Sequence, residues 1–135
     1  MKALLSAAAL LALAAPAFAG DVAVGEKEFG KCKSCHMIVA DDGTEIVKGG
    51  KVGPNLYGVV GRVAGSVDGY SYGDGLKAAQ AASVVWTEAE IAAFITDPKA
   101  WLDGKGHPTK SKMSFKAKAK QEDLAAYLAS VKPAQ

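Results

Sequence analysis

The stretch Cys32-Lys33-Ser34-Cys35-His36 contains both cysteines of this 135-residue chain. Its C-x-x-C-H spacing is typical of covalent haem attachment. The two thiols can form thioethers with the two vinyl groups of one porphyrin, and the adjacent histidine is then held beneath the iron as an axial ligand. The stretch therefore predicts one haem c attached through Cys32 and Cys35, with His36 as a ligand of the metal.

Two other kinds of site share the C-x-x-C spacing. A redox disulfide of the thioredoxin kind lies in a βαβ context, which is not evident in this sequence. A zinc site would need further ligands, but the chain has no second C-x-x-C and only one other histidine, His107. The adjacent His36 and the export signal described next favour haem over both alternatives.

The start of the chain has the organisation of an export signal. Lys2 gives the chain a positive start, which is followed by a nearly uninterrupted apolar run over residues 3–15 and by an A-x-A cleavage site at Ala17-Phe18-Ala19. A membrane anchor would need about 20 apolar residues, and this run is shorter. We expect a signal peptide over residues 1–19, cleaved near Ala19, and one domain over residues 20–135. Because c-type haem is attached outside the bacterial cytoplasm, a periplasmic location agrees with the haem motif.

A haem that carries electrons without binding gases needs a sixth iron ligand, and a thioether sulfur raises its reduction potential. The chain has three methionines. Met1 leaves with the signal peptide, and Met37 is tethered too closely to His36 to reach the opposite face of the porphyrin. Met113 remains, and its polar and basic neighbours make the usual core role of a methionine less natural. His107 is the competing candidate, but its loop-like surroundings favour a place at the surface.

Three segments have apolar residues at helical spacing. In the first, Val22–Cys32, the apolar residues share one face that leads into the haem motif. In the second, Thr87 and Glu90 form a capping box, and Pro98 should end the helix. The third, residues 121–131, begins with acidic residues that suit the positive end of a helix dipole. The sequence therefore predicts a largely helical domain.

Glycine-rich sequence between residues 37 and 75 predicts turns and loops. Val59, Val60 and Val63 could form a short strand, but the flanking glycines favour an extended loop. The chain has no internal repeat and no sign of a second domain.

The formal net charge of +2 conceals an asymmetry, because residues 99–120 contain seven lysines and a single acid, Asp103. A basic face suggests an acidic partner surface and electrostatic steering, although lysine-rich surfaces are also common on soluble proteins. The predicted rim of the exposed haem edge consists of four lysines: Lys31, Lys33, Lys112 and Lys116.

Several short motifs occur in a characteristic order along the domain. Gly25 and Phe29 precede the haem motif, Gly53-Pro54-Asn55-Leu56-Tyr57-Gly58 follows it, and Leu124 with Tyr127-Leu128 lies in the last helix. In this order they resemble the class I c-type cytochromes, close to bacterial cytochrome c2 and its mitochondrial relatives, over nearly all of residues 20–135. The resemblance implies an all-α monohaem cytochrome c fold. About five helices would pack around one covalently bound haem, with the N- and C-terminal helices crossing.

The resemblance also implies how the haem is held. The Pro54 carbonyl should accept the Nδ1 proton of His36, which fixes the ring and raises its basicity. Arg62, Tyr72 and Trp86 should donate hydrogen bonds to the haem propionates, because buried charge must be paired or hydrogen-bonded. Simple core packing is the alternative for Trp86.

The chain departs from the family pattern at a few positions. Phe94 stands where mitochondrial relatives usually have a tyrosine near the methionine sulfur, so the hydrogen bond of that tyrosine is lost. Leu76 stands where the family has an asparagine near the haem. Residues 39–52 and 101–110 are longer than in short members, as they are in larger bacterial cytochromes c2.

The function implied by the resemblance is one-electron transport, not enzyme catalysis. The expected electron donor is a cytochrome bc1 complex, and the expected acceptor is a photosynthetic reaction centre or a terminal oxidase. We expect a monomer that docks transiently on these complexes, is not inserted in the membrane and binds no nucleic acid. The alternative is a haem enzyme or gas-binding protein with an open sixth site, but no distal acid–base pair is evident. A domain that merely stores haem is a third possibility.

Overall fold

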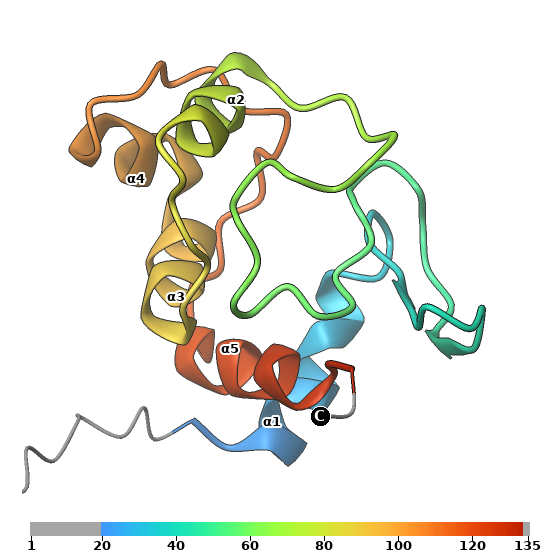
Figure 1. The fold of residues 1–135 in the computed structure, drawn as a ribbon. Helices are drawn as coiled ribbons and strands as arrows, with labels where there is room; N and C mark the ends of the chain where they lie inside the picture. The colour runs from blue at the N-terminus through green and yellow to red at the C-terminus, as the bar shows by residue number, and fades with distance from the viewer. Residues whose placement is uncertain (1–19, 134–135) are drawn as a thin grey trace, which may run out of the picture.

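Helices from the two ends of the domain cross and pack against each other (Figure 1). The structure, a computed structural model, describes residues 20–133. The predicted signal peptide, residues 1–19, lies outside the described residues. In chain order the elements are α1 (Val22–Glu28), the 3-10 helix η1 (Phe29–Lys31), β1 (Ile38–Val39), β2 (Glu45–Val47), α2 (Asp74–Ala81), α3 (Glu88–Thr96), α4 (Pro98–Gly104) and α5 (Gln121–Ser130). Five α-helices and one short hairpin in this part of the chain confirm the predicted all-α class.

The crossing of α1 and α5 depends on a close backbone approach at Gly25. A Cβ atom on Gly25 would lie 1.9 Å from the Asp123 carbonyl oxygen and 2.8 Å from the Cβ of Tyr127. About one helical turn after Gly25, the ring of Phe29 packs on the ring of Tyr127, with centroids 5.6 Å apart. Asp21, which caps α1 by accepting a hydrogen bond from the Val24 amide, also donates its own backbone N–H to the Asp123 carboxylate. Glycine is therefore required at this crossing.

Helix α3 begins as the sequence predicts, because the Thr87 hydroxyl oxygen accepts the Glu90 amide at 3.1 Å. The reciprocal half of the expected capping box is wrong, since the Glu90 carboxylate bonds to Trp101 and Lys105 instead. The prediction that the helix ends before Pro98 is confirmed. Asp97 then caps a new helix, α4, whose first residue is Pro98, a position that suits proline. The stretch that begins with Trp101, expected as a longer loop, is therefore helical as far as Gly104.

Helix α2 is not among the predicted helices. Its N-cap, Gly73, makes no side-chain capping hydrogen bond, and the helix contains a buried glycine, Gly75. A Cβ on Gly75 would lie 2.5 Å from the side chain of Leu102 and 2.4 Å from the Pro108 carbonyl oxygen. Glycine at this position therefore allows α2 to pack closely against the α4 region. From the local sequence alone, the same glycine indicates a loop.

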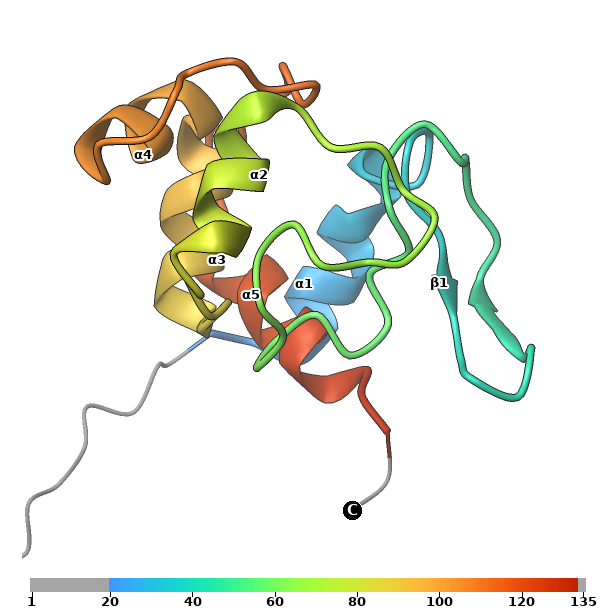
Figure 2. The same cartoon turned by 45° about the horizontal axis from the view of Figure 1, so that its top comes forward.

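The predicted longer loop over residues 39–52 carries the hairpin of β1 and β2, in which Ile38 pairs with Val47. In Figures 1 and 2 this hairpin lies on the side of the molecule away from α3 and α4. The valines at 59–63 form no strand, as expected, but they lie in successive turns rather than in an extended loop, and Val63 makes an isolated bridge to Val85. In the part of the chain that the structure describes, no helix has the length and apolarity needed to cross a membrane.

Candidate functional site

A cavity of about 330 Å³ lies between η1, α3, α5 and the loops that connect them. Its walls are mainly apolar, and the apolar lining residues include Phe29, Val59, Ile91, Phe94, Leu124 and Leu128. All the site residues predicted from the sequence line this one cavity: Cys32, Cys35, His36, Pro54, Arg62, Tyr72, Trp86 and Met113. A second hollow, between α3 and the start of α5, is lined by none of them. Residues far apart in the sequence are thus brought together around one apolar space.

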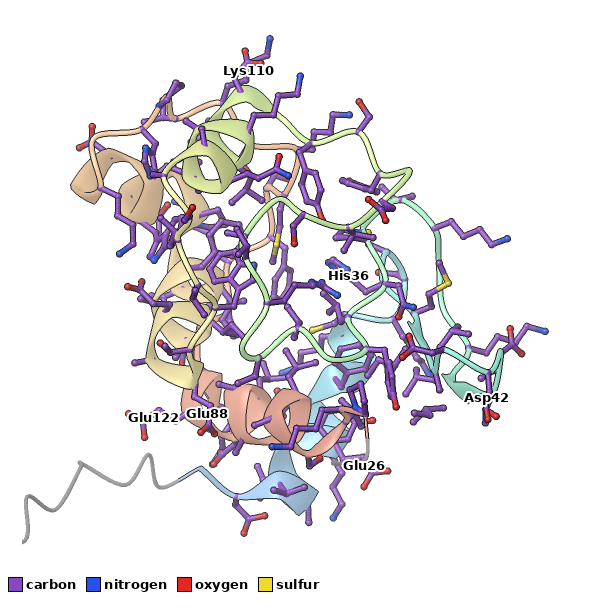
Figure 3. The ribbon with its side chains drawn as sticks, viewed as in Figure 1. Glu26, His36, Asp42, Glu88, Lys110 and Glu122 are labelled. Carbon is purple, nitrogen blue, oxygen red and sulfur yellow. The ribbon has the colours of Figure 1, made fainter. Side chains whose placement is uncertain are left out.

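The haem motif forms a tight helical turn directly after η1. The His36 amide donates to the Cys32 carbonyl at 2.9 Å, and the Cys35 amide donates to the same oxygen at 3.2 Å. This turn places Cys32 and His36 one helical turn apart. Figure 3 shows His36 in the middle of the molecule, whereas the labelled acids Glu26, Asp42, Glu88 and Glu122 lie around its outside.

The protonation of His36 is set by the carbonyl oxygen of Pro54, which lies 2.8 Å from Nδ1. Because a carbonyl can only accept, Nδ1 carries the proton and Nε2 keeps its lone pair. Burial lowers the pKa of His36, and the hydrogen bond to Pro54 opposes this only in part. The ring is therefore neutral near pH 7, which is the form in which histidine binds a metal.

Gly53 presses its backbone against the imidazole ring. A Cβ at this position would lie 2.4 Å from Cε1 and 2.6 Å from Nδ1 of His36. The ring is consequently held between this glycine and the Pro54 carbonyl, and the sequence reasoning did not single out Gly53. The sequence feature that could have indicated this role is its position as the first residue of the Gly-Pro-Asn motif.

We expect Gly53→Ala to displace His36 and to lower the free energy of unfolding of the holoprotein by about 1–3 kcal/mol, the usual cost of overpacking. Guanidinium titration followed by the haem absorption band measures this. Gly104→Ala is the matched control, since a Cβ on Gly104 meets nothing within 4 Å. Equal stability of the two variants would contradict the close contact at Gly53.

Cys32 is a half-buried thiol, and this burial, assisted by the nearby charge of Glu28, raises the pKa of Cys32 to about 11. Dithiol redox motifs work through a thiolate whose pKa is lowered. The surroundings of Cys32 therefore oppose the thioredoxin-like alternative. They fit a cysteine whose sulfur is uncharged because it forms a thioether with a second carbon atom.

Arg62 is a half-buried cation on the cavity wall. Its guanidinium donates to the Tyr57 carbonyl at 3.1 Å and to the Asn55 carbonyl at 3.2 Å. No carboxylate among residues 20–133 forms an ion pair with it. Burial lowers the pKa of Arg62 without discharging it near pH 7. Since buried charges are normally paired, this site suits an anionic group of a bound cofactor, and the residues fit a haem with its propionates.

Tyr72 and Trp86 flank the same region. The Tyr72 oxygen accepts the Val67 amide at 3.2 Å, which leaves its hydroxyl proton available to donate. Burial raises the pKa of Tyr72, so the hydroxyl stays protonated. Trp86 is 7% exposed and packs on Phe94 and Trp101, with ring centroids 5.0 Å away in both cases. Trp86 therefore combines the core role with a position on the cavity wall.

The segment that contains Met113 is tied down on both sides. The Ser111 hydroxyl oxygen accepts the Met113 amide at 3.1 Å. Further along, the Lys116 ammonium lies 2.8 Å from the Asp97 carboxylate, and the Ala117 amide donates to the Ile95 carbonyl at 2.7 Å. These contacts hold the half-buried Met113 on the cavity wall.

His107, the competing ligand candidate, does not line the cavity. The expectation that it lies at the surface holds only in part, because the residue is half-buried and its Nε2 is enclosed, with no hydrogen-bond partner among the described residues.

The four lysines predicted at the rim are all exposed, but they differ in their partners. Lys31 and Lys112 line the cavity mouth, whereas Lys33 and Lys116 do not. Lys31 pairs with Glu28 at 2.6 Å and Lys116 with Asp97 at 2.8 Å. Lys112 donates to the Ser71 carbonyl and lies 5.8 Å from the centroid of the Tyr70 ring. Part of the positive charge is thus already matched within the chain.

Asn55, which follows Pro54, organises the loop beneath the site. Its side-chain oxygen accepts the amides of Val39 at 3.0 Å and Tyr57 at 3.1 Å, and its side-chain nitrogen donates to the Val39 carbonyl at 2.8 Å. These bonds join the hairpin to the turn that presents the Pro54 carbonyl to His36. The sequence reasoning gave this asparagine no role of its own.

The C-x-x-C-H motif, with its neutral histidine, lies on the wall of an apolar cavity, and the terminal helices of the domain cross. Together these features define a class I c-type cytochrome. The chain is 58% identical over 135 residues to cytochrome c2 of Rhodobacter capsulatus, covering 97% of this chain and 98% of that protein. It is 53% identical over 133 residues to cytochrome c-550 of Paracoccus denitrificans, covering 94% and 84%. No protein-family model matches the chain.

Solved structures agree with these relatives. Cytochrome c2 from Rhodobacter capsulatus superposes with a TM-score of 0.81 at 55% identity, covering 83% of this chain and 98% of that one. Ferric cytochrome c-550 from Paracoccus versutus also gives a TM-score of 0.81 at 55% identity, covering 85% and 100%. The chain belongs to the cytochrome c2 and c-550 family. The predicted family, fold and single covalent haem c are thereby confirmed, and the general role is that of an electron-carrier cytochrome.

Proposed function

We propose that this protein is a periplasmic one-electron carrier whose haem c is attached through Cys32 and Cys35 and ligated by His36 and Met113. The observation that carries the proposal is the neutral His36 ring, with its proton fixed on Nδ1, on the wall of the cavity that Met113 also lines. When bound, the haem supplies a reversible one-electron change at its iron.

We propose that residues of the chain set the reduction potential of the haem. The soft thioether of Met113 would favour the ferrous state, and the hydrogen bond from His36 to Pro54 would keep the histidine ligand basic and oriented. The apolar cavity wall keeps water away from the iron. If His36 and Met113 both ligate the iron, the haem would have no open position for a substrate, and the protein would be a carrier and not an enzyme.

Arg62, Tyr72 and Trp86 are proposed to hold the propionates. Three guanidinium protons of Arg62 remain after its two backbone contacts, and they can meet a carboxylate at the cavity wall. Tyr72 can add a neutral donor, as can the Trp86 indole. Charge from Arg62 and neutral donors together would compensate buried carboxylates.

The proposed partners are membrane redox complexes, with a cytochrome bc1 complex as donor and a photosynthetic reaction centre or terminal oxidase as acceptor. A monomer would dock through Lys31 and Lys112 at the cavity mouth, together with the exposed Lys33 and Lys116. Short-lived complexes of this kind bury little surface. Export through residues 1–19 would place the protein beside these complexes, and a mature N-terminus near Gly20 in the periplasmic fraction tests that placement.

We expect electron delivery between a purified cytochrome bc1 complex and this protein to slow as ionic strength rises, because salt screens the steering charges. Lys33→Glu should lower the second-order rate constant at low salt and flatten its salt dependence, since Lys33 has no ion-pair partner among the described residues. Lys99→Glu on α4 is the control with an equal charge change, because neither Lys99 nor its chain neighbours line the cavity, whereas Lys33 lies between the lining residues Cys32 and Ser34. A salt-independent rate, or equal effects of the two variants, would contradict docking through this face.

A further inference from the structure

The main chain of Trp86 is bonded to the segment that carries Arg62. The Trp86 amide donates to the Arg62 carbonyl at 2.9 Å, and the Trp86 carbonyl accepts the Gly61 amide at 2.7 Å. These bonds place the backbones of two proposed propionate donors side by side. The direction of the Trp86 indole N–H still depends on the rotamer of its side chain, and therefore on the groups that pack against the ring.

Two aromatic rings pack on the Trp86 indole. Trp101 on α4 stacks on it, with centroids 5.0 Å apart and an interplanar angle of 29°. Phe94 on α3 packs at 5.0 Å with the planes at 60°, and it also meets the Trp101 ring edge to face at 5.3 Å. Trp86 and Phe94 line the cavity, whereas Trp101 does not. The Trp101 ring therefore bounds the Trp86 indole on the side away from the cavity.

Trp101 is itself held by a pair of charged groups. Its Nε1 donates to Glu90 Oε2 at 2.6 Å, and the other carboxylate oxygen accepts Lys105 Nζ at 2.6 Å. The Lys105 ammonium also lies 5.1 Å from the centroid of the Trp101 ring. A hydrogen bond to an ionised acceptor is among the stronger ones, and it fixes the direction of the indole in its own plane. The carboxylate and the ammonium together restrict the position of Trp101.

The ion pair of Glu90 and Lys105 contributes little stability by itself, because both side chains are 30% exposed. Burial raises the pKa of Glu90, but the hydrogen bonds from Lys105 and Trp101 outweigh it and lower this pKa, so the acceptor is ionised near pH 7. Glu90 lies four residues before Phe94, on the same face of α3. One helix face thus supplies both the acceptor for Trp101 and a ring that packs on Trp86.

We propose that Glu90 is a positioning residue for the haem: its carboxylate fixes Trp101, and the stacked Trp101 ring holds Trp86 in the orientation in which the indole N–H donates to a propionate. This role rests on the haem placement of the proposed function. It extends the groups that act on the haem to Glu90 and Trp101, neither of which lines the cavity.

The expected consequence is a change in the reduction potential of the haem. An ionised propionate stabilises ferric iron through its negative charge, and a hydrogen-bond donor offsets part of that charge. An indole N–H that no longer points at the propionate leaves this charge uncompensated. The ferric state then gains stability, and the potential falls.

Two variants at position 90 separate the hydrogen bond from the charge. Glu90→Met and Glu90→Gln both remove the negative charge, and both new residues suit a helix. Only glutamine keeps an oxygen that can accept the Trp101 indole proton. We expect redox titration to give Glu90→Met a lower potential than Glu90→Gln, because the loss of charge is common to both.

The indole N–H groups are observed directly by nuclear magnetic resonance. The chain has two tryptophans, so ferrous holoprotein labelled at the indole nitrogens gives two N–H signals, which Trp101→Phe assigns. In Glu90→Met the Trp101 signal should move upfield, and the Trp86 proton should exchange with solvent several-fold faster. Glu88→Met, the same replacement on the same helix, is the control, and both of its signals should match the wild type.

Trp86→Phe tests whether Glu90 acts through Trp86. The difference in potential between Glu90→Met and Glu90→Gln should vanish when each is combined with Trp86→Phe, because phenylalanine has no N–H to position. A difference that persists in this background, or one that is absent with Trp86 in place, would overturn the positioning role of Glu90.

Covalent haem and a reversible titration are verified for each variant beforehand. A normal haem whose potential and indole signals are the same with methionine and glutamine at position 90 refutes the positioning role alone. A potential that Trp86→Phe leaves unchanged refutes the proposed propionate contact of Trp86 together with that role. Absence of covalent haem from the wild type refutes the proposed function as a whole.

Discussion

Replacement of Met113 by leucine is expected to lower the reduction potential by on the order of 0.1 V or more, out of the roughly 0.8 V range that haem axial ligands span. Leucine keeps the apolar volume on the cavity wall, so the contacts of Ser111 and Lys116 that hold this segment should persist. Only the sulfur is lost. The weak near-infrared band of a sulfur–iron bond should disappear from the ferric protein, and the ferrous protein should take up carbon monoxide.

The matched control is Met37→Leu, because Met37 follows His36 directly and does not line the cavity. Its potential, near-infrared band and carbon monoxide response should match the wild type. Retention of the band in Met113→Leu would assign the sixth position to another residue. Rapid carbon monoxide binding by the wild type would instead support the alternative of a haem enzyme or gas-binding protein with an open site.

Gly25→Ala is expected to lower the free energy of unfolding of the holoprotein by about 3 kcal/mol, at the upper end of overpacking costs. Helix propensity taken alone gives the opposite sign, since alanine is favoured over glycine in a helix by about 1 kcal/mol. The collision decides the outcome, because the new Cβ would lie 1.9 Å from the backbone oxygen of Asp123. A backbone atom cannot move aside as a flexible side chain can, so α1 and α5 must separate.

Gly30→Ala serves as the control, since a Cβ there meets nothing within 4 Å. Guanidinium unfolding curves of the two variants, followed by far-ultraviolet circular dichroism, measure the difference. A Gly25→Ala variant as stable as Gly30→Ala would show that the terminal helices do not require this close approach.

Local signals in the sequence were sufficient for several elements. The hydroxyl of Thr87 caps α3 through a contact only three residues away, and Pro98 ends that helix through its own ring geometry. The acids at the start of α5 act on the dipole of their own helix. Interactions of this short range depend on nearby residues alone, so a sequence pattern can predict them.

Other features depended on residues brought from elsewhere in the chain. Gly75 is read as a loop signal, yet it lies inside α2. Glycine is needed at this position because Leu102 leaves no room for a side chain. Glu90 is expected to complete a capping box, yet Trp101 and Lys105 on the neighbouring segment bind its carboxylate instead. In both cases a tertiary contact outweighs a local preference.

The sequence by itself determined the covalent haem chemistry of this protein, because C-x-x-C-H fixes the thiols and the histidine within one helical turn. It also predicted Met113 as the second ligand, because the composition leaves no other available sulfur. Only the tertiary structure decided the environment of that chemistry. It brought Arg62 to the cavity wall without a carboxylate partner in the described chain, pressed Gly53 against His36 and stacked Trp101 behind Trp86. The physical reason is range: covalent spacing is written along the chain, whereas burial, charge pairing and close contact arise between segments that meet only when the chain folds.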